Sequence, residues 1–332
     1  MTTIRELDGA PSVLAGYGKA FASALPLVSS LPLPISLPGG GSGELPDLEL
    51  RVPSLKTDLN HLAAYANVCG FTLKDTLPAT YLNVRAFPVH IALMTDGNFP
   101  FGPVGLVHLT NTIVHHRPVS VREELALRVW TTGLDPHPKG RTLTLHTEAS
   151  SDGEVVWAAE STMLRLGKGT GERVARAADV GVPASATWKV PGDQGRRYAA
   201  VSGDRNPIHL YGLTAKPFGF PRAIAHGLWT KARAIAALEG QLPDAFTVRV
   251  EFRKPVLLPT KVTFGSVTDA KGVTSFAVED ARKGSAHLVG PITAAPRKKA
   301  PAKKRAASRK PPAPAQPVRG TTTTTATEGT TA

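Results

Sequence analysis

Hydrophobic and polar residues form strand-like runs along several segments of the chain, and these runs predict the strands of an antiparallel sheet. These segments span residues 106–115, 124–130, 142–149, 155–165, 246–253, 261–267 and 274–279. Helical spacing of apolar residues predicts helices at 60–70, around Tyr198 and at about 226–239, and the start of another at Pro88–Met94. A few helices among many strands predict an α+β protein.

The two groups of elements resemble each other in sequence. YANVCGF (65–71) aligns with YAAVSGD (198–204), PVHIALMT (88–95) with IAHGLWTK (224–231), and HHRPV (115–119) with FRKPV (252–256). The offsets are 133, 136 and 137 residues, so both order and spacing are kept. A duplicated domain, in which one helix is wrapped by an antiparallel sheet, is the simplest account of this repeat.

Composition divides the chain into five parts. They are an N-terminal amphipathic helix with a Pro/Gly-rich strap (1–43), a first globular unit (44–166), a polar linker (167–184), a second globular unit (185–292) and a basic, then Thr-rich tail (293–332). The helix, about Val13–Leu25, is expected to pack on the globular body, with a membrane-surface helix as the alternative. Acidic Glu6 and Asp8 stand where an export signal has positive charge, so we do not predict such a signal.

The net charge of +13 comes mostly from the tail. Residues 296–332 carry nine Lys or Arg and one acid, Glu328, which leaves +5 for the other 295 residues. The stretch 296–320 has no acid and cannot bury a core, so it is predicted to be disordered. Non-specific contact with DNA or another polyanion is one expectation for it. A solvated tail, or contact with an acidic carrier protein or an anionic membrane, is the alternative.

The composition of the globular part fits an intracellular protein. Of the 332 residues 42% are hydrophobic, which is ample for a packed core, and no stretch approaches the ~20 apolar residues that span a bilayer. The single cysteine, Cys69, excludes an intramolecular disulfide framework, and we expect it to be a small buried residue. These features predict a cytoplasmic location.

One short segment gathers three polar side chains that can carry chemistry. In YAAVSGDRNPIHLYGLTA (198–215), Asp204, Asn206 and His209 lie close together in sequence. A carboxylate and an imidazole that share a water can remove a proton from it and return a proton elsewhere. Asn206 can orient that water or brace the loop. On spacing alone, an Asx-turn that caps the next helix, with a surface histidine, stays open as an alternative.

The same segment resembles the signature of the MaoC-like dehydratase / hydratase 2 family. The matching positions are Tyr198, Val201, Ser202, Gly203, Asp204, Asn206, Pro207, Ile208, His209 and Ala215. The resemblance implies a hot-dog fold and, with the repeat, a double hot-dog of two tandem units, each with a long helix wrapped by an antiparallel sheet. It also implies reversible hydration of trans-2-enoyl thioesters to (R)-3-hydroxyacyl thioesters in fatty acid metabolism, with coenzyme A or acyl carrier protein as the carrier.

The resemblance further implies roles for individual residues. Asp204 and His209 would be the catalytic pair that activates water, supported by Asn206. The later segment IAHGLWT (224–230) resembles the start of the family's long helix, where the backbone N–H of Gly227 would bind the thioester oxygen. The unpaired N–H groups and the dipole of a helix N-terminus suit the negative charge that develops on this oxygen. No metal or redox cofactor is expected, because the thioester already acidifies the α-proton.

The first unit departs from this pattern at every chemical position. By the internal alignment, the residues that replace Asp204, Asn206, His209 and Gly227 are Phe71, Leu73, Thr76 and Ile91. The unit resembles the non-catalytic half of double hot-dog hydratases. We therefore expect one active site per chain and a first half that shapes the acyl tunnel.

Basic residues outside the loop are candidates for binding the carrier. Lys231, Arg253 and Lys254 are expected to meet the phosphates of coenzyme A, with solvated charges as the alternative. A double hot-dog mimics a dimer of single hot-dogs, so a monomer is compatible with the prediction, and so is a homodimer.

No metal site is predicted from the remaining histidines. His115 and His116 lack a third and a fourth ligand, and His108, Asp135 and His137 form no ligand set.

Two other classes of function stay open beside the enzyme. One is a non-catalytic acyl-thioester-binding subunit of a dehydratase complex, which would not need the intact set of Asp204, Asn206 and His209. The other is a DNA-associated protein that acts through its basic tail.

Overall fold

The computed structural model describes residues 2–9, 11–13, 15–16, 18, 43–172, 181–295 and 329. The described helices and strands belong to a unit of residues 1–298, and residues 299–332 form a second unit. Of the predicted N-terminal helix, positions 13, 15, 16 and 18 are helical. The rest of that helix, the strap up to residue 42, linker residues 173–180 and the basic tail from residue 296 to 328 lie outside the described residues.

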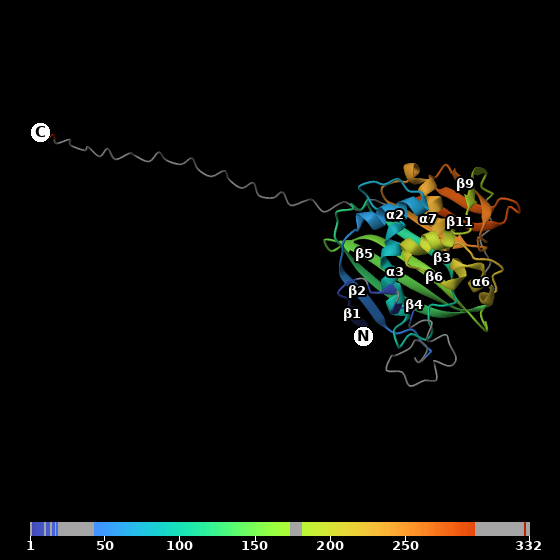
Figure 1. The fold of residues 1–332 in the computed structure, drawn as a ribbon, viewed down its shortest axis with the longest axis horizontal. Helices are drawn as coiled ribbons and strands as arrows, with labels where there is room; N and C mark the ends of the chain where they lie inside the picture. Colours follow the sequence, from blue (N-terminus) through green and yellow to red (C-terminus); the bar gives the residue numbers. More distant parts are fainter. Residues whose placement is uncertain are drawn as a thin grey trace. The chain divides into compact units, whose positions relative to one another are not determined.

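The described part is built on one sheet of eleven strands (Figure 1). The strands are β1 (Thr3–Glu6), β2 (Leu48–Leu55), β3 (Leu106–His115), β4 (Leu125–His137), β5 (Gly140–Ser151), β6 (Glu154–Leu166), β7 (Ala184–Val190), β8 (Phe246–Phe252), β9 (Thr260–Thr268), β10 (Thr274–Asp280) and β11 (Ala286–Ala294). Their order across the sheet is β1-β2-β4-β5-β6-β3-β8-β11-β10-β9-β7. Only β1 and β2 pair in parallel, and every other neighbouring pair is antiparallel.

The order of the strands in one half of the sheet is the reverse of the order of the equivalent strands in the other half. Strands β2-β4-β5-β6-β3 of the first half correspond to β7-β9-β10-β11-β8 of the second, and the halves join where β3 pairs with β8. In this seam Ile113 lies opposite Val248, both fully buried. The predicted α+β double hot-dog is therefore confirmed, with a continuous sheet shared by its two units.

Each half carries its helices on the sheet. The helices are α2 (Leu59–Cys69), α3 (Tyr81–Met94), α4 (Gln194–Ser202), α5 (Pro207–Leu210), α6 (Gly212–Ala215) and α7 (Gly227–Ala237), with short 3-10 helices at Lys216–Phe218 and Glu239–Gln241. Helix α3 packs on β2, β4 and β5, and α7 packs on β10 and β11. Figure 1 shows α3 and α7 lying across the strands of their own halves. Helix α2 contacts both α4 and α7, so it connects the halves on the helical side.

Local sequence explains where several helices begin and end. Asp58 caps α2 by accepting hydrogen bonds from the N–H groups of Asn60 and His61. The helix ends at Gly70, whose φ of 80° is the left-handed conformation that glycine adopts most easily. The prediction that α3 starts near Pro88 is wrong, because α3 begins seven residues earlier at Tyr81 and contains Pro88 in its interior. Proline favours a first turn but is not restricted to it.

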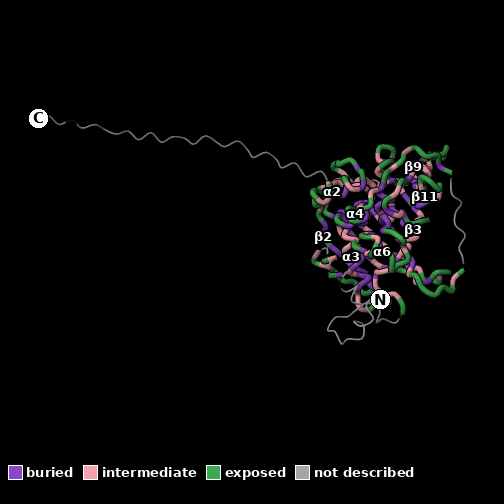
Figure 2. The backbone as a smooth tube through the Cα atoms, turned by 45° about the vertical axis from the view of Figure 1, so that its right-hand side comes forward, coloured by how far each residue is buried: buried purple, intermediate pink, exposed green. Residues whose placement is uncertain are grey.

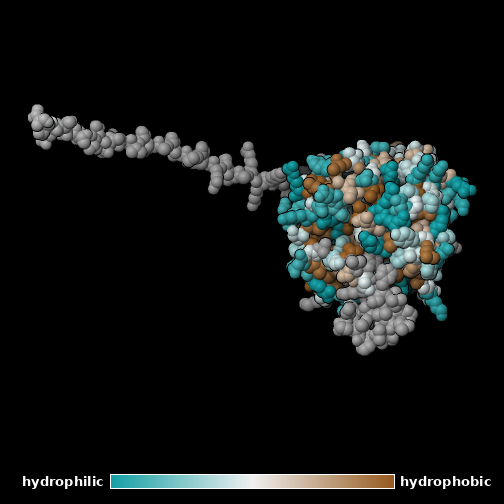
Figure 3. Space-filling view, viewed as in Figure 1, coloured by the Kyte–Doolittle hydropathy of each residue, from teal (hydrophilic) through white to brown (hydrophobic). Residues whose placement is uncertain are grey.

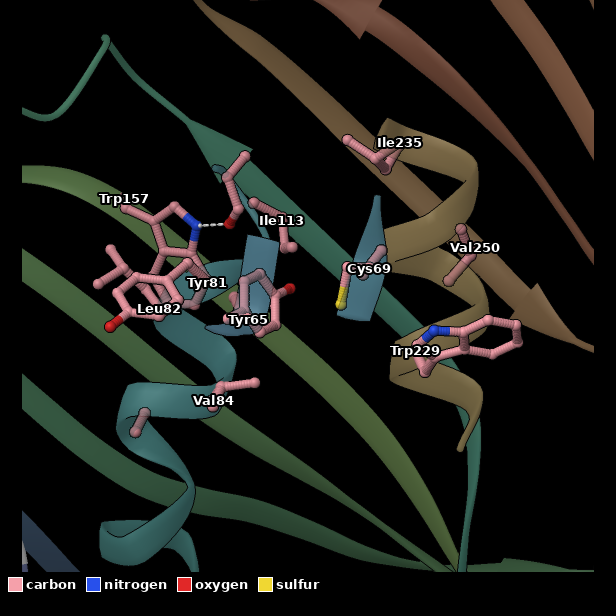
Figure 4. Packing of buried hydrophobic residues seen from close by; sticks show 14 of the residues in the cluster. Tyr65, Cys69, Tyr81, Leu82, Val84, Ile113, Trp157, Trp229, Ile235 and Val250 are labelled. Atoms are coloured by element: carbon pink, nitrogen blue, oxygen red, sulfur yellow. Dashed lines mark hydrogen bonds between the residues drawn. The ribbon is translucent and has the colours of Figure 1, made fainter. Parts of the chain in front are cut away.

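Aromatic residues that donate buried hydrogen bonds fix the helices to the sheet (Figure 4). The indole N–H of Trp157 donates to the Ala79 carbonyl oxygen at 2.7 Å, the dashed line in Figure 4, and the Tyr65 hydroxyl donates to Thr80 Oγ1 at 2.8 Å. Cys69 is fully buried, which confirms the expectation for it, and burial raises the pKa of its thiol to about 12. Figure 2 shows buried residues concentrated between helices and sheet, with exposed residues around them.

The strand predictions fail where proline, glycine or polar residues interrupt the pattern. Strand β3 has the predicted bounds, whereas the pattern does not predict β1, β2, β7 or β11. Strand β11 contains Gly290 and Pro291, residues that usually mark the end of a strand. It also runs to Ala294, so the boundary predicted at residue 293 is two residues early. Among the described residues, no helix has the length and apolar character needed to cross a membrane.

Candidate active site

The predicted chemical residues lie on the loop that leaves α4 in the second half. Helix α4 ends at Gly203, whose φ of 74° turns the chain sharply. The N–H of Asn206 donates to Asp204 Oδ1 at 3.1 Å, and the N–H of Ile208 donates to Asn206 Oδ1 at 3.4 Å. These two turns start α5 and bring Asp204 and His209 to one side of the loop.

The Asx-turn alternative is correct for this loop and wrong for its histidine. Asp204 forms the turn and Asn206 caps α5, so the Asn206 carboxamide oxygen braces the loop. His209 is not a surface residue, because only 8% of it is exposed.

His209 has a defined hydrogen-bonding state. Its Nδ1 lies 2.9 Å from the Ile224 carbonyl oxygen, which can only accept, so Nδ1 carries the proton. In the neutral ring Nε2 is then an acceptor. Burial lowers the pKa of His209, and the nearby negative charge of Asp204 partly offsets this effect. The imidazole is therefore a neutral base at physiological pH.

A second imidazole, that of His226, stacks on His209. The ring centroids are 3.7 Å apart with an angle of 26° between the rings. His226 Nε2 donates to the Asp204 backbone carbonyl oxygen at 3.0 Å and lies 3.7 Å from Asp204 Oδ2. Burial, reinforced by His209, lowers the pKa of His226 to about 3. His226 thus stays neutral and ties the Asp204 loop to the start of α7.

The carboxylate and the two imidazoles form a compact cluster. One ligand-type atom each of Asp204, His209 and His226 lies within 4.8 Å of the other two. Each imidazole already gives one ring nitrogen to a backbone carbonyl, and Asp204 Oδ1 accepts from Asn206. The protein itself thus orients the cluster, and a carboxylate beside an imidazole acceptor suits proton transfer through a shared water.

Gly227 begins α7 next to this cluster. The first N–H groups of a helix have no partner within it, and the helix dipole places partial positive charge there. A Cβ at this position would lie 2.9 Å from Cε1 of the Phe252 ring, which is too close for any other residue without a shift of the ring. This close contact favours glycine at the position, where the N–H has no partner within the helix.

Two cavities meet at the cluster. The inner cavity, of about 50 Å³, lies between the halves and is bordered by first-half residues such as Phe87, Met94 and Met163 together with Asp204 and His226. The outer cavity, of about 150 Å³, is bordered by Phe220, Phe252, Arg253 and Lys254 among others. Three residues border both cavities: His108, His209 and Gly227.

Of the basic candidates, two border the outer cavity and one does not. Lys254 is exposed there, while the Arg253 side chain is largely buried and pairs with Glu251 at 3.0 Å. The expectation for Lys231 is wrong, because its side chain is fully buried. Its ammonium donates to Asn111 Oδ1 at 2.5 Å, to the Asn111 carbonyl oxygen at 3.2 Å and to that of Val248 at 3.4 Å. Lys231 therefore binds the β3–β8 seam and cannot reach a phosphate.

Comparisons with known proteins bear on this geometry. The model of the MaoC like domain matches residues 174–285, a range that contains the loop and the start of α7. The 3-hydroxyacyl-thioester dehydratase X of Mycobacterium tuberculosis is 33% identical over 286 residues, covering 85% of this chain and 98% of that protein. The chain belongs to the MaoC-like dehydratase family.

Solved structures of MaoC-like proteins have the same fold. The crystal structure of HtdX from Mycobacterium tuberculosis has 33% identity and a TM-score of 0.67, and covers 74% of this chain and all of that one. A MaoC-like dehydratase from Phytophthora capsici has 20% identity and a TM-score of 0.62, and covers 74% of this chain and 95% of that one. The resemblance on which the sequence prediction rests is thus confirmed.

Sequence reasoning missed two histidines of this MaoC-like site. His226 belongs to the predicted helix start, but no sequence signal shows that it stacks on His209. His108 forms no metal ligand set in sequence and so attracts no prediction, yet it borders both cavities from strand β3 of the first half. Its placement depends on how the two halves pack together, which the sequence pattern does not predict.

Proposed function

We propose that this MaoC-like protein catalyses the reversible addition of water to trans-2-enoyl thioesters, giving (R)-3-hydroxyacyl thioesters, in fatty acid metabolism. One observation carries the proposal: a base, a carboxylate and a helix N-terminus converge where the inner and outer cavities join. A thioester bound with its acyl chain inward and its carrier arm outward would place its reacting carbons at this junction.

The geometry supports a definite division of roles. Asp204 and His209 Nε2 would hold a water and remove its proton as the oxygen attacks Cβ, and a proton would then reach Cα on the same face. The N–H of Gly227 would stabilise the negative charge on the thioester oxygen. One such donor is typically worth ~3–4 kcal/mol, and general acid–base assistance contributes ~10²–10⁴-fold. In dehydration the same groups work in reverse.

The chemistry itself suggests that no metal or redox cofactor takes part. The thioester withdraws electrons from Cα, so the enolate-like intermediate needs only hydrogen-bond donors and a proton source. The carrier, coenzyme A or acyl carrier protein, belongs to the substrate. Lys254, exposed at the rim of the outer cavity, and Arg253 beside it are the residues that we assign to its phosphates.

Several properties of the protein stay predictions. They are the choice between the two carriers, a homodimeric state, the cytoplasmic location and the contact of residues 296–320 with polyanions. The assignment of one active site to residues 185–292 and none to residues 44–166 likewise belongs to this proposal.

The test is a hydration assay with the full-length protein. Trans-2-enoyl-CoA esters of short, medium and long chain are supplied, the loss of the conjugated enoyl absorbance is followed, and the product is resolved on a chiral column. We expect the (R)-alcohol, and the preferred chain length reports the inner cavity. If neither coenzyme A esters nor acyl carrier protein esters are turned over, the chain is a non-catalytic acyl-binding protein and the proposal is wrong.

A further inference from the structure

We propose that His108, on strand β3 of the first half, is a catalytic residue that donates a hydrogen bond to the thioester carbonyl oxygen alongside Gly227. The inference rests on the function proposed above and adds a residue from the half that lacks the signature loop. In this account the reacting centre is completed by both halves of the chain.

His108 lies where the inner and outer cavities join. Only three of the described residues border both the inner and the outer cavity, and they are His209, Gly227 and His108. The first is the proposed base and the second the proposed donor to the thioester oxygen. A thioester that runs from one cavity into the other must pass between these three residues. His108 therefore contacts the same part of the substrate as the two groups already assigned.

His108 and Gly227 both contact the ring of Phe252. The His108 ring packs edge-on against the Phe252 ring, with centroids 5.9 Å apart. Phe252 in turn lies against the Cα of Gly227, since a Cβ there would meet its ring at 2.9 Å. Phe252 thus contacts both groups, and His108 and Gly227 both border the junction of the two cavities.

The His108 ring has hydrogen-bonding capacity to offer a ligand. Neither ring nitrogen of His108 bonds to another of the described residues, whereas the neighbouring His90 of the inner cavity has its Nε2 bonded to Thr147 Oγ1 at 2.8 Å. Burial lowers the pKa of His108 to about 4, so the ring is neutral and offers one N–H. A neutral imidazole can donate to a carbonyl oxygen without losing a proton.

The residues already assigned give the thioester oxygen one hydrogen-bond donor. Neutral His209 gives its only N–H to Ile224, so toward the substrate it offers an acceptor. Asp204 as a carboxylate is an acceptor as well. Gly227 would otherwise be alone in facing the negative charge of the enolate-like state, although sites of this kind usually align more than one donor.

The experiment compares three full-length variants in the hydration assay. His108→Leu removes the donor, and His108→Gln keeps an N–H on a side chain of similar reach. His115→Leu is the matched control, because His115 is a buried histidine at the other end of the same strand and borders neither of these cavities. Circular dichroism and thermal unfolding confirm that each variant is folded before kcat and KM are measured.

We expect His108→Leu to lower kcat about 100-fold with KM within about threefold of wild type. His108→Gln should have a kcat at least about tenfold higher than that of His108→Leu. His115→Leu should keep kcat within about threefold of the wild-type value. The inference is overturned if folded His108→Leu keeps its kcat, if only KM rises, or if His108→Gln is as slow as His108→Leu. Wild-type protein that turns over no enoyl thioester would instead overturn the proposed function itself, and this inference with it.

Discussion

The two halves of the molecule share a topology and differ in what their equivalent pockets contain. The outer cavity is bordered by His209, Phe252 and Pro255 of the second half. A pocket of about 120 Å³, also lined by residues of both halves, is bordered by the aligned first-half residues Thr76, His115 and Pro118. Phe71 borders that pocket at the position that aligns with Asp204. At these aligned positions the first half thus has a pocket but neither the acid nor the base.

One polar position is common to both halves. His90 in α3 aligns with His226 at the start of α7, both are buried, and burial lowers the pKa of each to about 3. His90 bonds to Thr147, and His226 bonds to the Asp204 loop. A buried neutral histidine at this point therefore serves the fold in both halves, and the second half additionally uses it to hold a functional loop.

The comparison teaches that a few positions separate a site from a structural copy of it. Tyr65 and Tyr198, which align in the repeat, are both buried and lie 6.5 Å apart between their ring centroids. Such core residues are retained because packing is needed in both halves, whereas chemical residues are needed only once. The first half remains useful because it closes the inner cavity and places His108 at the junction.

The largest expected effect comes from substituting the proposed catalytic residues of the second half, which the first half lacks. Asp204→Asn and His209→Gln should each lower kcat about 10²–10⁴-fold, because they remove general acid–base assistance. The matched control is Thr76→Val, the substitution at the first-half position that aligns with His209, which should leave kcat within about threefold. Enoyl-CoA hydration is the measurement. Near-wild-type turnover by folded Asp204→Asn would place the chemistry elsewhere.

The next effect tests why α7 begins with glycine while α3 carries Ile91 at the aligned position. Gly227→Ala should lower kcat about 10–100-fold, since its Cβ would push against the Phe252 ring and shift the N–H from the thioester oxygen. Adding Phe252→Leu removes the obstructing ring and should restore part of the rate. If the double variant is no faster than Gly227→Ala, the steric explanation is wrong.

The next prediction concerns Lys231, whose buried side chain lies at the β3–β8 seam between the halves. Its burial lowers the pKa of the ammonium well below 10.5, and no described carboxylate pairs with it. Above the folded-state pKa the unfolded chain binds one more proton than the folded chain, so stability rises with pH until about pH 10.5. Lys231→Met removes this dependence.

Urea unfolding of wild type and Lys231→Met between pH 7 and pH 10 measures the effect. The difference in unfolding free energy, wild type minus variant, should grow with pH in the part of this range that lies above the folded-state pKa of Lys231. If the unfolding free energies of wild type and Lys231→Met change in parallel with pH, Lys231 keeps its ordinary pKa and the explanation from burial is wrong.

The smallest effect concerns the histidine that the halves share. Because His90 and His226 have folded-state pKa values of about 3, the unfolded chain binds more protons below pH 6.5, and stability falls as the pH falls. His90→Gln and His226→Gln should each flatten that fall by about 1 kcal/mol between pH 6 and pH 5. Urea unfolding at the two pH values measures it, and an unchanged slope in either variant would show that its histidine is not held neutral.

Much of the fold follows from local pattern, and the parts that do not have physical causes. Strand β3 contains no glycine or proline, and its predicted and observed bounds agree. Strand β11 contains Pro291 and also Gly290, where a Cβ would lie 2.0 Å from the Arg249 carbonyl oxygen of β8. The interior position of Pro88 in α3 escapes prediction because tertiary packing overrides a local preference.

The site was predictable where a single loop carries it. Asp204, Asn206 and His209 are close in sequence, and the turn that joins them is local. Lys231 and His108 depend on long-range contacts, since the lysine is buried at the β3–β8 seam and the histidine borders cavities lined by residues of both halves. Figure 3 shows hydrophobic and polar residues intermixed over the face of the molecule that it presents.

The central claim is that the chain contains two copies of one fold and a single active site completed by both. Calorimetric titration of the wild-type protein with a saturated acyl-CoA, which can be neither hydrated nor dehydrated, tests it most directly. The account predicts one equivalent bound per chain, with a Kd equal to the constant for competitive inhibition of hydration. Two equivalents per chain, or one that leaves hydration uninhibited, would contradict it.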